Sequence, residues 1–286
     1  MKQTHRVSAS GILVYPVYSR RSGGLSLGIN MFPGEKSCSF DCPYCELLPF
    51  SAKAVFSPGQ MEEDLRAAVC SALDGNIEIK DICFSGNGEP TMSADFPEAL
   101  ERASRVRAEQ LPGVNLVLIT NGSGLLDGGI FSLLREAAFS PGLDIWLKLD
   151  AGTPEWYEKI NRATIPFEKI ISKIKEFAAC APFVIQTMLC AIDGEGPPQG
   201  EAEAWEKLML ELAAIAASSL RKVQIYGKAR PAPEDPKTQA LPTEYLEKRA
   251  SSLRRALAAA LTAELAVAPK QTGGSALRMP SVEVYT

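Results

Sequence analysis

Several features that would assign a sequence to a familiar class are missing from this one. The chain has a single histidine, His5, among 286 residues, so a metal site built mainly of imidazole is excluded. No apolar run approaches the roughly 18 to 20 residues that a membrane-spanning helix needs. The amino-terminal segment "MKQTHRVSAS" contains no apolar leader. We therefore expect neither a membrane protein nor a secreted one.

Positive charge is not in excess either. The formal net charge is -4, so no broad basic field gathers nucleic acid, and DNA is not expected as a partner. Seven cysteines, an odd number without a leader, do not make a disulfide framework. We therefore expect a reducing compartment, with the cytoplasm as the default.

Six short apolar runs, rich in Leu or β-branched residues, alternate with helical patterns. Continuous apolar runs are typical of parallel strands covered on both faces, and they span residues 25–32, 81–86, 115–120, 144–150, 183–192 and 222–227. Helical spacing of apolar residues occurs in 57–73, 167–179, 201–220 and 242–261. The alternation predicts an α/β fold, either a partial (β/α) barrel or an open doubly wound sheet.

The two ends of the chain extend this repeat. Residues 1–24 indicate a short strand and a turn, residues 25–230 the repeated region, and residues 231–286 a helical extension. The tail "MPSVEVYT" could add an edge strand. Three arginines at helical spacing, at positions 102, 105 and 107, are interpreted as a solvated helix face.

The segment "KSCSFDCPYCEL" places Cys38, Cys42 and Cys45 within eight positions. Pro43 and the turn-prone "GEKS" favour a loop over a helix here. Structural zinc needs four protein ligands, and a ferredoxin-type cluster needs four cysteines. The other cysteines, Cys70, Cys83, Cys180 and Cys190, are scattered and have no assigned role. Three thiolates with one open position suit a catalytic cluster; zinc with a distant ligand, and incidental buried thiols, remain alternatives.

The C-x3-C-x2-C pattern with an aromatic before its last cysteine resembles the radical S-adenosylmethionine (radical SAM) enzymes. The resemblance implies a 4Fe-4S cluster on Cys38, Cys42 and Cys45, with Tyr44 beside the adenine of S-adenosylmethionine. It also implies an oxidoreductase- or lyase-type enzyme that reductively cleaves S-adenosylmethionine to a 5′-deoxyadenosyl radical for hydrogen abstraction. An external low-potential donor, a flavodoxin or ferredoxin, would supply the electron.

A second element, "SGNGEPT", follows the second predicted strand and resembles the Gly-Gly-Glu-Pro element of that family. The resemblance assigns Gly86, Asn87, Gly88, Glu89 and Pro90 to binding the cofactor's methionine ammonium through backbone groups. Gly88 has no Cβ to obstruct a close approach. Asn87 stands where the family has glycine, which puts the role of its carbonyl in doubt.

Two later strand ends complete the predicted site. By resemblance, Asn121 in "LITNGSG" faces the site, and Lys148 and Asp150 in "IWLKLDAG" lie near the ribose and carboxylate of S-adenosylmethionine. Lys148 and Asp150 share one strand face, so a mutually satisfied structural ion pair is the alternative. Gln186 is a weak candidate for the substrate side.

Motifs across about 220 residues, among them "INRATIPFEKI" and "VQIYGKARPAPED", resemble a narrower group. These are largely uncharacterised iron–sulfur oxidoreductases related to wyosine-type tRNA-modifying enzymes, and they favour a partial (β/α)6 barrel. No cysteine precedes Cys38, which disfavours the two-cluster wyosine chemistry, and none follows Cys190. The substrate is unknown: a small molecule, tRNA, or a partner protein activated as a glycyl radical. A non-catalytic iron–sulfur electron-transfer protein is the alternative function.

Overall fold

The computed structural model describes residues 11–47, 50–215, 219–232, 237–267 and 279–286. His5 therefore lies outside the described residues. By its internal contacts the chain divides into two compact units, Met1–Ser39 with Leu47–Trp146, and Phe40–Glu46 with Leu147–Thr286. The cysteine segment is shared, because Cys38 belongs to the first unit and Cys42 and Cys45 belong to the second.

The first unit is built on strands that follow one another in the sheet in chain order. They are β1 (Val14–Ser19), β2 (Gly24–Ile29), β3 (Ile79–Phe84), β4 (Asn115–Thr120) and β5 (Leu143–Lys148), whose last two residues belong to the second unit. The pair β1 and β2 is antiparallel, whereas β2, β3 and β4 are parallel. Their carboxyl ends therefore lie along one edge, which is where ligand sites gather in parallel sheets.

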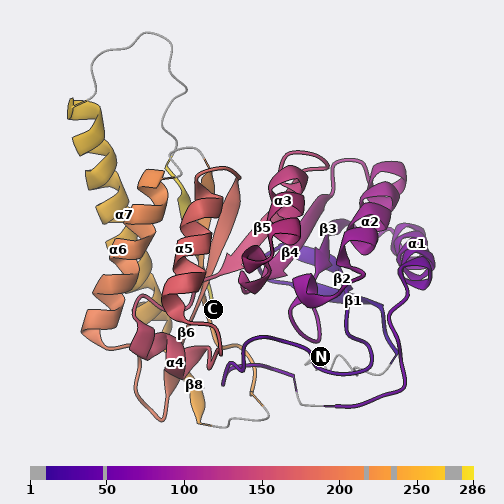
Figure 1. The fold of residues 1–286 in the computed structure, drawn as a ribbon, viewed down its shortest axis with the longest axis horizontal. Coiled ribbons are helices and arrows are strands. Elements are labelled where there is room, and N and C mark those ends of the chain that lie inside the picture. The colour runs from indigo at the N-terminus through magenta and orange to yellow at the C-terminus, as the bar shows by residue number, and fades with distance from the viewer. Residues whose placement is uncertain (1–10, 48–49, 216–218, 233–236, 268–278) are drawn as a thin grey trace. The chain divides into compact units, whose positions relative to one another are not determined.

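Helices α1 (Pro58–Asp74), α2 (Phe96–Gln110) and α3 (Gly128–Ala137) connect these strands (Figure 1). The Ser57 hydroxyl caps α1 by accepting a hydrogen bond from the Gln60 N–H at 3.4 Å. Met61, Leu65 and Val69 repeat at helical spacing and are fully buried, so they hold α1 against the core. Two short 3-10 helices, η1 (Pro90–Met92) and η2 (Ser123–Leu126), follow β3 and β4.

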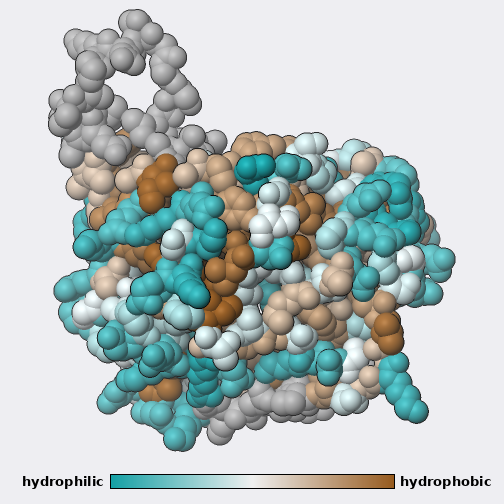
Figure 2. All heavy atoms as spheres, viewed as in Figure 1, coloured by the Kyte–Doolittle hydropathy of each residue, from teal (hydrophilic) through white to brown (hydrophobic). Residues whose placement is uncertain are grey.

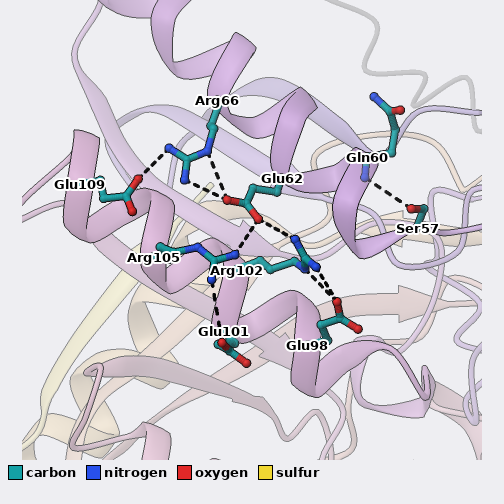
Figure 3. Close-up of polar contacts among 9 residues, drawn as sticks. All are labelled: Ser57, Gln60, Glu62, Arg66, Glu98, Glu101, Arg102, Arg105 and Glu109. Carbon is teal, nitrogen blue, oxygen red and sulfur yellow. Dashed lines mark hydrogen bonds and ion pairs between the residues drawn. The ribbon is translucent and has the colours of Figure 1, made fainter.

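A group of charged residues joins α1 to α2 on the surface of the first unit. The Glu62 carboxylate accepts hydrogen bonds from Arg102 and Arg105 at 2.8 Å and from Arg66 at 2.9 Å (Figure 3). Hydrogen bonds from Arg105 and Arg66 are the main cause that lowers the pKa of Glu62 to about 2. Of the three arginines predicted to form a solvated face, Arg102 and Arg105 thus pair with the neighbouring helix, whereas Arg107 donates a hydrogen bond to the Pro141 carbonyl at 2.9 Å.

The second unit continues the strand–helix repeat. Its elements are α4 (Pro154–Ile160), α5 (Phe167–Ala178), β6 (Phe183–Ile192), α6 (Gln199–Ile215), β7 (Leu220–Gly227), β8 (Thr238–Ala240), α7 (Thr243–Val267) and β9 (Ser281–Tyr285). The strands β6, β7 and β9 are parallel neighbours, and β8 pairs antiparallel with β6. In Figure 1, α5, α6 and α7 lie side by side, with α6 in contact with both of the others.

The predicted α/β alternation is confirmed, with boundaries that shift by a few residues. All six predicted strands are present as β2 to β7, the strand expected near the amino terminus is β1, and the carboxyl-terminal edge strand is β9. The helices α3 and α4 were not predicted. The first begins with two glycines, and the second has only 7 residues, which is too short for a periodic pattern.

The exposed large apolar residues come from several parts of the described chain. On the face shown in Figure 2, hydrophilic residues lie between the apolar ones. The most exposed large apolar side chains, Val55 at 85% and Phe139 at 67%, come from separate connections. Within the described residues, no helix is long and apolar enough to span a membrane.

Candidate functional site

The loop that carries Cys38 is hydrogen-bonded to the segment that follows β3. The Ser37 N–H donates to the Asn87 carbonyl at 3.0 Å, and the Glu89 N–H donates to the Ser37 carbonyl at 2.8 Å. Gly88 lies between these bonds with φ +154°, and a Cβ there would overlap the Ser37 carbonyl oxygen. Glycine is therefore required at this position because the chain's own cysteine loop approaches its backbone so closely.

Asn87 binds back to the end of β2 and leaves one acceptor without a partner. Its N–H donates to Asn30 Oδ1 at 3.1 Å, and its Nδ2 donates to the Phe32 carbonyl at 3.1 Å. A carbonyl only accepts, so this bond sets the orientation of the side-chain amide. Asn87 Oδ1 is buried and has no hydrogen-bond partner among the described residues. A buried acceptor of this kind is suited to a ligand that brings a donor.

Glu89 joins the ends of β3 and β4 through a buried carboxylate. Oε1 accepts hydrogen bonds from the hydroxyls of Thr91 at 2.6 Å and Thr120 at 2.7 Å, and Oε2 accepts from the Asn121 N–H at 2.7 Å. Burial raises the pKa of Glu89, and these donors oppose that rise. Since its oxygens are engaged by protein donors, Glu89 positions the neighbouring segments.

Asn121 places its side-chain amide against the first cysteine. Its Oδ1 accepts a hydrogen bond from the Ser123 N–H at 2.9 Å, so Nδ2 points the other way. Nδ2 donates to Ser39 Oγ at 3.0 Å and to Cys38 Sγ at 3.6 Å. The structure therefore brings together Cys38, the segment 86–90 and Asn121 within the first unit.

In the second unit, a turn carries the other two cysteines, and no helix forms through them. The Cys45 N–H donates to the Cys42 carbonyl at 3.0 Å, and the Asp41 N–H donates to the Asn161 carbonyl at 3.0 Å. Asn161 Nδ2 donates to Cys42 Sγ at 3.5 Å. Burial, with a smaller contribution from the Asp150 charge, raises the pKa of Cys42 to about 12. A thiolate here needs a bound cation to compensate its charge.

Asp150 accepts hydrogen bonds from several directions in the same unit. Its Oδ1 accepts from the Met188 N–H at 2.8 Å, and its Oδ2 accepts from Asn161 Nδ2 at 2.9 Å and from the Tyr44 hydroxyl. Lys148 Nζ lies 3.5 Å from Oδ2. We call these residues, with Asp150 at their centre, the Asp150 network. Burial is the main cause that raises the pKa of Tyr44 well above its usual value, followed by the charge of Asp150.

Lys148 lies between two aromatic rings. Its Nζ is 4.9 Å from the centre of the Tyr44 ring and 5.1 Å from that of Tyr226, and it donates a hydrogen bond to the Tyr226 hydroxyl. Burial has the largest single effect on the pKa of Lys148 and would lower it, but the charge of Asp150 and the neighbouring Tyr226 and Cys42 together outweigh burial and raise the pKa. The ion pair that the sequence left as an alternative is therefore present and mutually satisfied.

Other second-unit residues hold the cysteine turn. The Thr238 hydroxyl donates to the Pro43 carbonyl at 3.2 Å, and Arg230 forms an ion pair with Glu46 at 2.7 Å. Gln186, the weak substrate-side candidate, is fully buried and donates to Gln224 Oε1 at 2.7 Å.

Sequence reasoning missed Asn161, Tyr226 and Thr238. Asn161 and Tyr226 lie in motifs shared with the narrower group, which was the signal available for them, and Thr238 lies outside those motifs. No local pattern marks contacts such as Asn161 to Cys42 or Thr238 to Pro43, which join residues more than a hundred positions apart.

The described residues contain no group of three His, Cys, Asp or Glu side chains arranged around a single metal ion. A 4Fe-4S cluster is a different case, since its thiolates bind separate irons. Thiols with amide donors fit such a cluster, because hydrogen bonds to the sulfurs are one of the ways a protein tunes it. The Asn87 acceptor fits the ammonium group of S-adenosylmethionine.

The sequence profile of the Radical SAM superfamily matches residues 36–196, which is more than half of the chain and includes the cysteine segment. The chain belongs to the radical SAM superfamily. A UPF0026 protein of Helicobacter pylori is 31% identical over 171 residues, 58% of this chain and 50% of that protein. A UPF0026 protein of Synechocystis is 28% identical over 226 residues, 76% of each chain. The match thus spans about half the length of the Helicobacter pylori relatives.

Solved structures agree with the fold. A radical SAM methyltransferase from Sphaerobacter thermophilus superposes with a TM-score of 0.59 at 16% identity, covering 95% of this chain and 69% of that one. TYW1 with a lysine–pyruvate adduct bound gives 0.52 at 15% identity, covering 80% and 73%. Streptococcus suis SuiB bound to S-adenosylmethionine gives 0.52 at 14%, covering 87% and 45%. The predicted partial (β/α)6 fold and the predicted cofactors, a 4Fe-4S cluster and S-adenosylmethionine, are confirmed at the level of the family.

Proposed function

We propose that this chain is a radical enzyme that binds one 4Fe-4S cluster through Cys38, Cys42 and Cys45. The observation that carries the proposal is the way the cysteine loop is bound. In the first unit its backbone pairs with Asn87 and Glu89 of the family's cofactor-binding element. The remaining cysteines are left as thiols, Cys83 and Cys190 buried and Cys70 and Cys180 exposed, and none belongs to the loop.

Asn87 and Tyr44 are the residues that we propose contact S-adenosylmethionine. Asn87 Oδ1 would accept a hydrogen bond from the methionine ammonium group, since its own amide hydrogens are directed to Phe32. Tyr44 would pack beside the adenine and stays neutral, because its pKa is raised. Lys148 and Asp150 serve chiefly to hold Tyr44, since they are already paired with each other.

Bound in this way, the reduced cluster would supply one electron to the sulfonium of S-adenosylmethionine, giving methionine and a 5′-deoxyadenosyl radical that takes hydrogen from the substrate. The electron would come from a low-potential flavodoxin or ferredoxin. The chain's own residues bind and orient the two groups and exclude water from the buried side chains around them. We propose the cytoplasm as the compartment, and a small molecule, tRNA or a protein as the substrate.

Two alternatives to a radical enzyme are an iron–sulfur electron carrier and a zinc-binding protein. A carrier that only transfers electrons has no use for a binding element such as residues 86–90, and a protein that binds zinc would contain no iron.

The test is anaerobic reconstitution with iron and sulfide, then addition of S-adenosylmethionine and dithionite, with 5′-deoxyadenosine measured by mass spectrometry. We expect product from the wild type and none from Cys42→Ala, which should also lose iron. Cys70→Ala is the matched control, because Cys70 is exposed on α1.

Product in Cys42→Ala, or a wild type with an iron–sulfur absorbance but no product, would overturn the proposed reaction. In the second case electron transfer would become the better function. A wild type that binds zinc in place of iron would overturn both.

A further inference from the structure

Two asparagine side chains, one in each unit, donate hydrogen bonds to cysteine sulfurs of the loop. Asn121 Nδ2 lies 3.6 Å from Cys38 Sγ, and Asn161 Nδ2 lies 3.5 Å from Cys42 Sγ. Both asparagines are buried, at 5% and 2% exposure, so their amides are held in place, whereas Cys38 is exposed and Cys42 is partly exposed. These two residues come from separate elements, since Asn121 follows β4 and Asn161 ends α4.

In each asparagine, another contact sets which end of the amide faces the sulfur. Asn121 Oδ1 accepts from the Ser123 N–H, a group that can only donate. Asn161 Nδ2 donates its other hydrogen to the Asp150 carboxylate, a group that accepts when ionised. Reversing the Asn121 amide would place its NH2 group against the Ser123 N–H, and reversing the Asn161 amide would place its oxygen against the Asp150 carboxylate. Both amides therefore present N–H groups to the cysteines.

We propose that Asn121 and Asn161 are positioning residues that raise the reduction potential of the cluster by donating N–H···S hydrogen bonds to Cys38 and Cys42. The inference rests on the proposed function, since it takes these cysteines as cluster ligands. One-electron reduction adds negative charge that is shared by the cysteine sulfurs, and a donor stabilises the reduced form more than the oxidised form. The two amides thus make the cluster easier for a flavodoxin or ferredoxin to reduce.

Asn161 has a second role that links the cluster to the Asp150 network. The same Nδ2 contacts Cys42 Sγ and Asp150 Oδ2, and Asp150 also accepts from Tyr44. The Asn161 carbonyl holds the Asp41 N–H at 3.0 Å, directly before Cys42. A substitution of Asn161 therefore changes the surroundings of Cys42 Sγ and leaves the hydrogen bond from Asn121 to Cys38 in place.

The test uses Asn121→Leu, Asn161→Leu and the double variant, because leucine has the same branched arrangement of side-chain atoms as asparagine and lacks its donors. Asn115→Leu is the matched control, since Asn115 is exposed at the start of β4. Each reconstituted protein is titrated anaerobically without S-adenosylmethionine, and the reduced fraction is followed by electron paramagnetic resonance. We expect each single variant to lower the ratio of reduced to oxidised protein at a fixed potential by about tenfold, equal to about 59 mV for one electron.

The double variant should shift further than either single one, and Asn115→Leu should match the wild type. An unchanged midpoint in variants that keep their iron would overturn the inference while leaving the proposed function intact. Cluster formation in the wild type is measured before any variant is compared. A wild type that forms no cluster would overturn the proposed function instead.

A second measurement covers variants that lose iron. The wild type is labelled with [15N-amide]asparagine, reduced, and examined by electron–nuclear double resonance. We expect 15N couplings in the wild type. A single variant that retains the cluster should lose only the coupling of the asparagine that it replaces. Absence of 15N coupling in the wild type would overturn the inference without reference to any variant.

Discussion

The substitution Asp150→Ala tests whether the Asp150 network stabilises the protein or serves the cofactor directly. It removes one buried carboxylate and leaves Lys148 without its ion-pair partner at 3.5 Å. It also removes the acceptor of the Met188 N–H, of the Asn161 amide and of the Tyr44 hydroxyl. Asp150 is 2% exposed, so water does not replace these bonds without rearrangement.

The size of the effect follows from what is left unpaired. Removing one partner of a buried ion pair costs about 3–5 kcal/mol, and each unsatisfied donor would cost roughly 1–3 kcal/mol if counted alone. These contributions share one site and do not add. We therefore expect Asp150→Ala to lower the free energy of unfolding by about 3–5 kcal/mol.

The assay is urea unfolding of the iron-free protein, so that loss of a cofactor does not contribute. Tryptophan fluorescence reports on the second unit through Trp156 and Trp205, which are buried there, and circular dichroism gives an independent probe. The matched control is Glu176→Ala, since Glu176 pairs with Lys173 on the exposed face of α5. It should change the free energy of unfolding by about 1 kcal/mol or less.

A double variant separates the two interpretations. Lys148→Met with Asp150→Leu removes both charges, and should recover part of the stability lost in Asp150→Ala because apolar replacement of a whole buried pair is often tolerated. If Asp150→Ala unfolds like the wild type to within about 1 kcal/mol and binds S-adenosylmethionine more weakly, our reasoning is wrong. Asp150 would then act on the cofactor directly.

Two further predictions concern the first unit. The pKa of Glu62 is lowered to about 2 from its usual 4.5, so its ion pairs stabilise the folded state fully above pH 4.5. The stability advantage of the wild type over Glu62→Gln should shrink as the pH falls from 4.5 towards 2, and an advantage that grows in acid would contradict it. Gly88→Ala should reduce iron bound after reconstitution, because the new Cβ displaces Ser37 beside Cys38. Gly128→Ala, which meets nothing within 4 Å, should leave iron binding unchanged, and equal loss in both variants would refute the prediction.

Much of the fold followed from local patterns. The buried strands are short apolar runs, and the longer helices repeat apolar residues every three or four positions, so their order was readable without any tertiary contact. What escaped were elements with weak local signals, such as α4 with 7 residues. The edge strand β9 was expected only as an option, because its pairing with β7 depends on residues far from it in the chain.

The sequence by itself determined the chemistry that this chain can offer: three closely spaced thiols, a glycine-rich element after the second predicted strand, and a lysine and an aspartate on one strand face. Short-range spacing carries that information because it survives any arrangement of the rest of the chain. Only the tertiary structure decided which side chains surround those groups. Asn161 reaches Cys42 across 119 positions, and Asn121 reaches Cys38 across 83. Such contacts exist only once distant elements pack together, because the energy of a buried hydrogen bond depends on the partner that folding supplies.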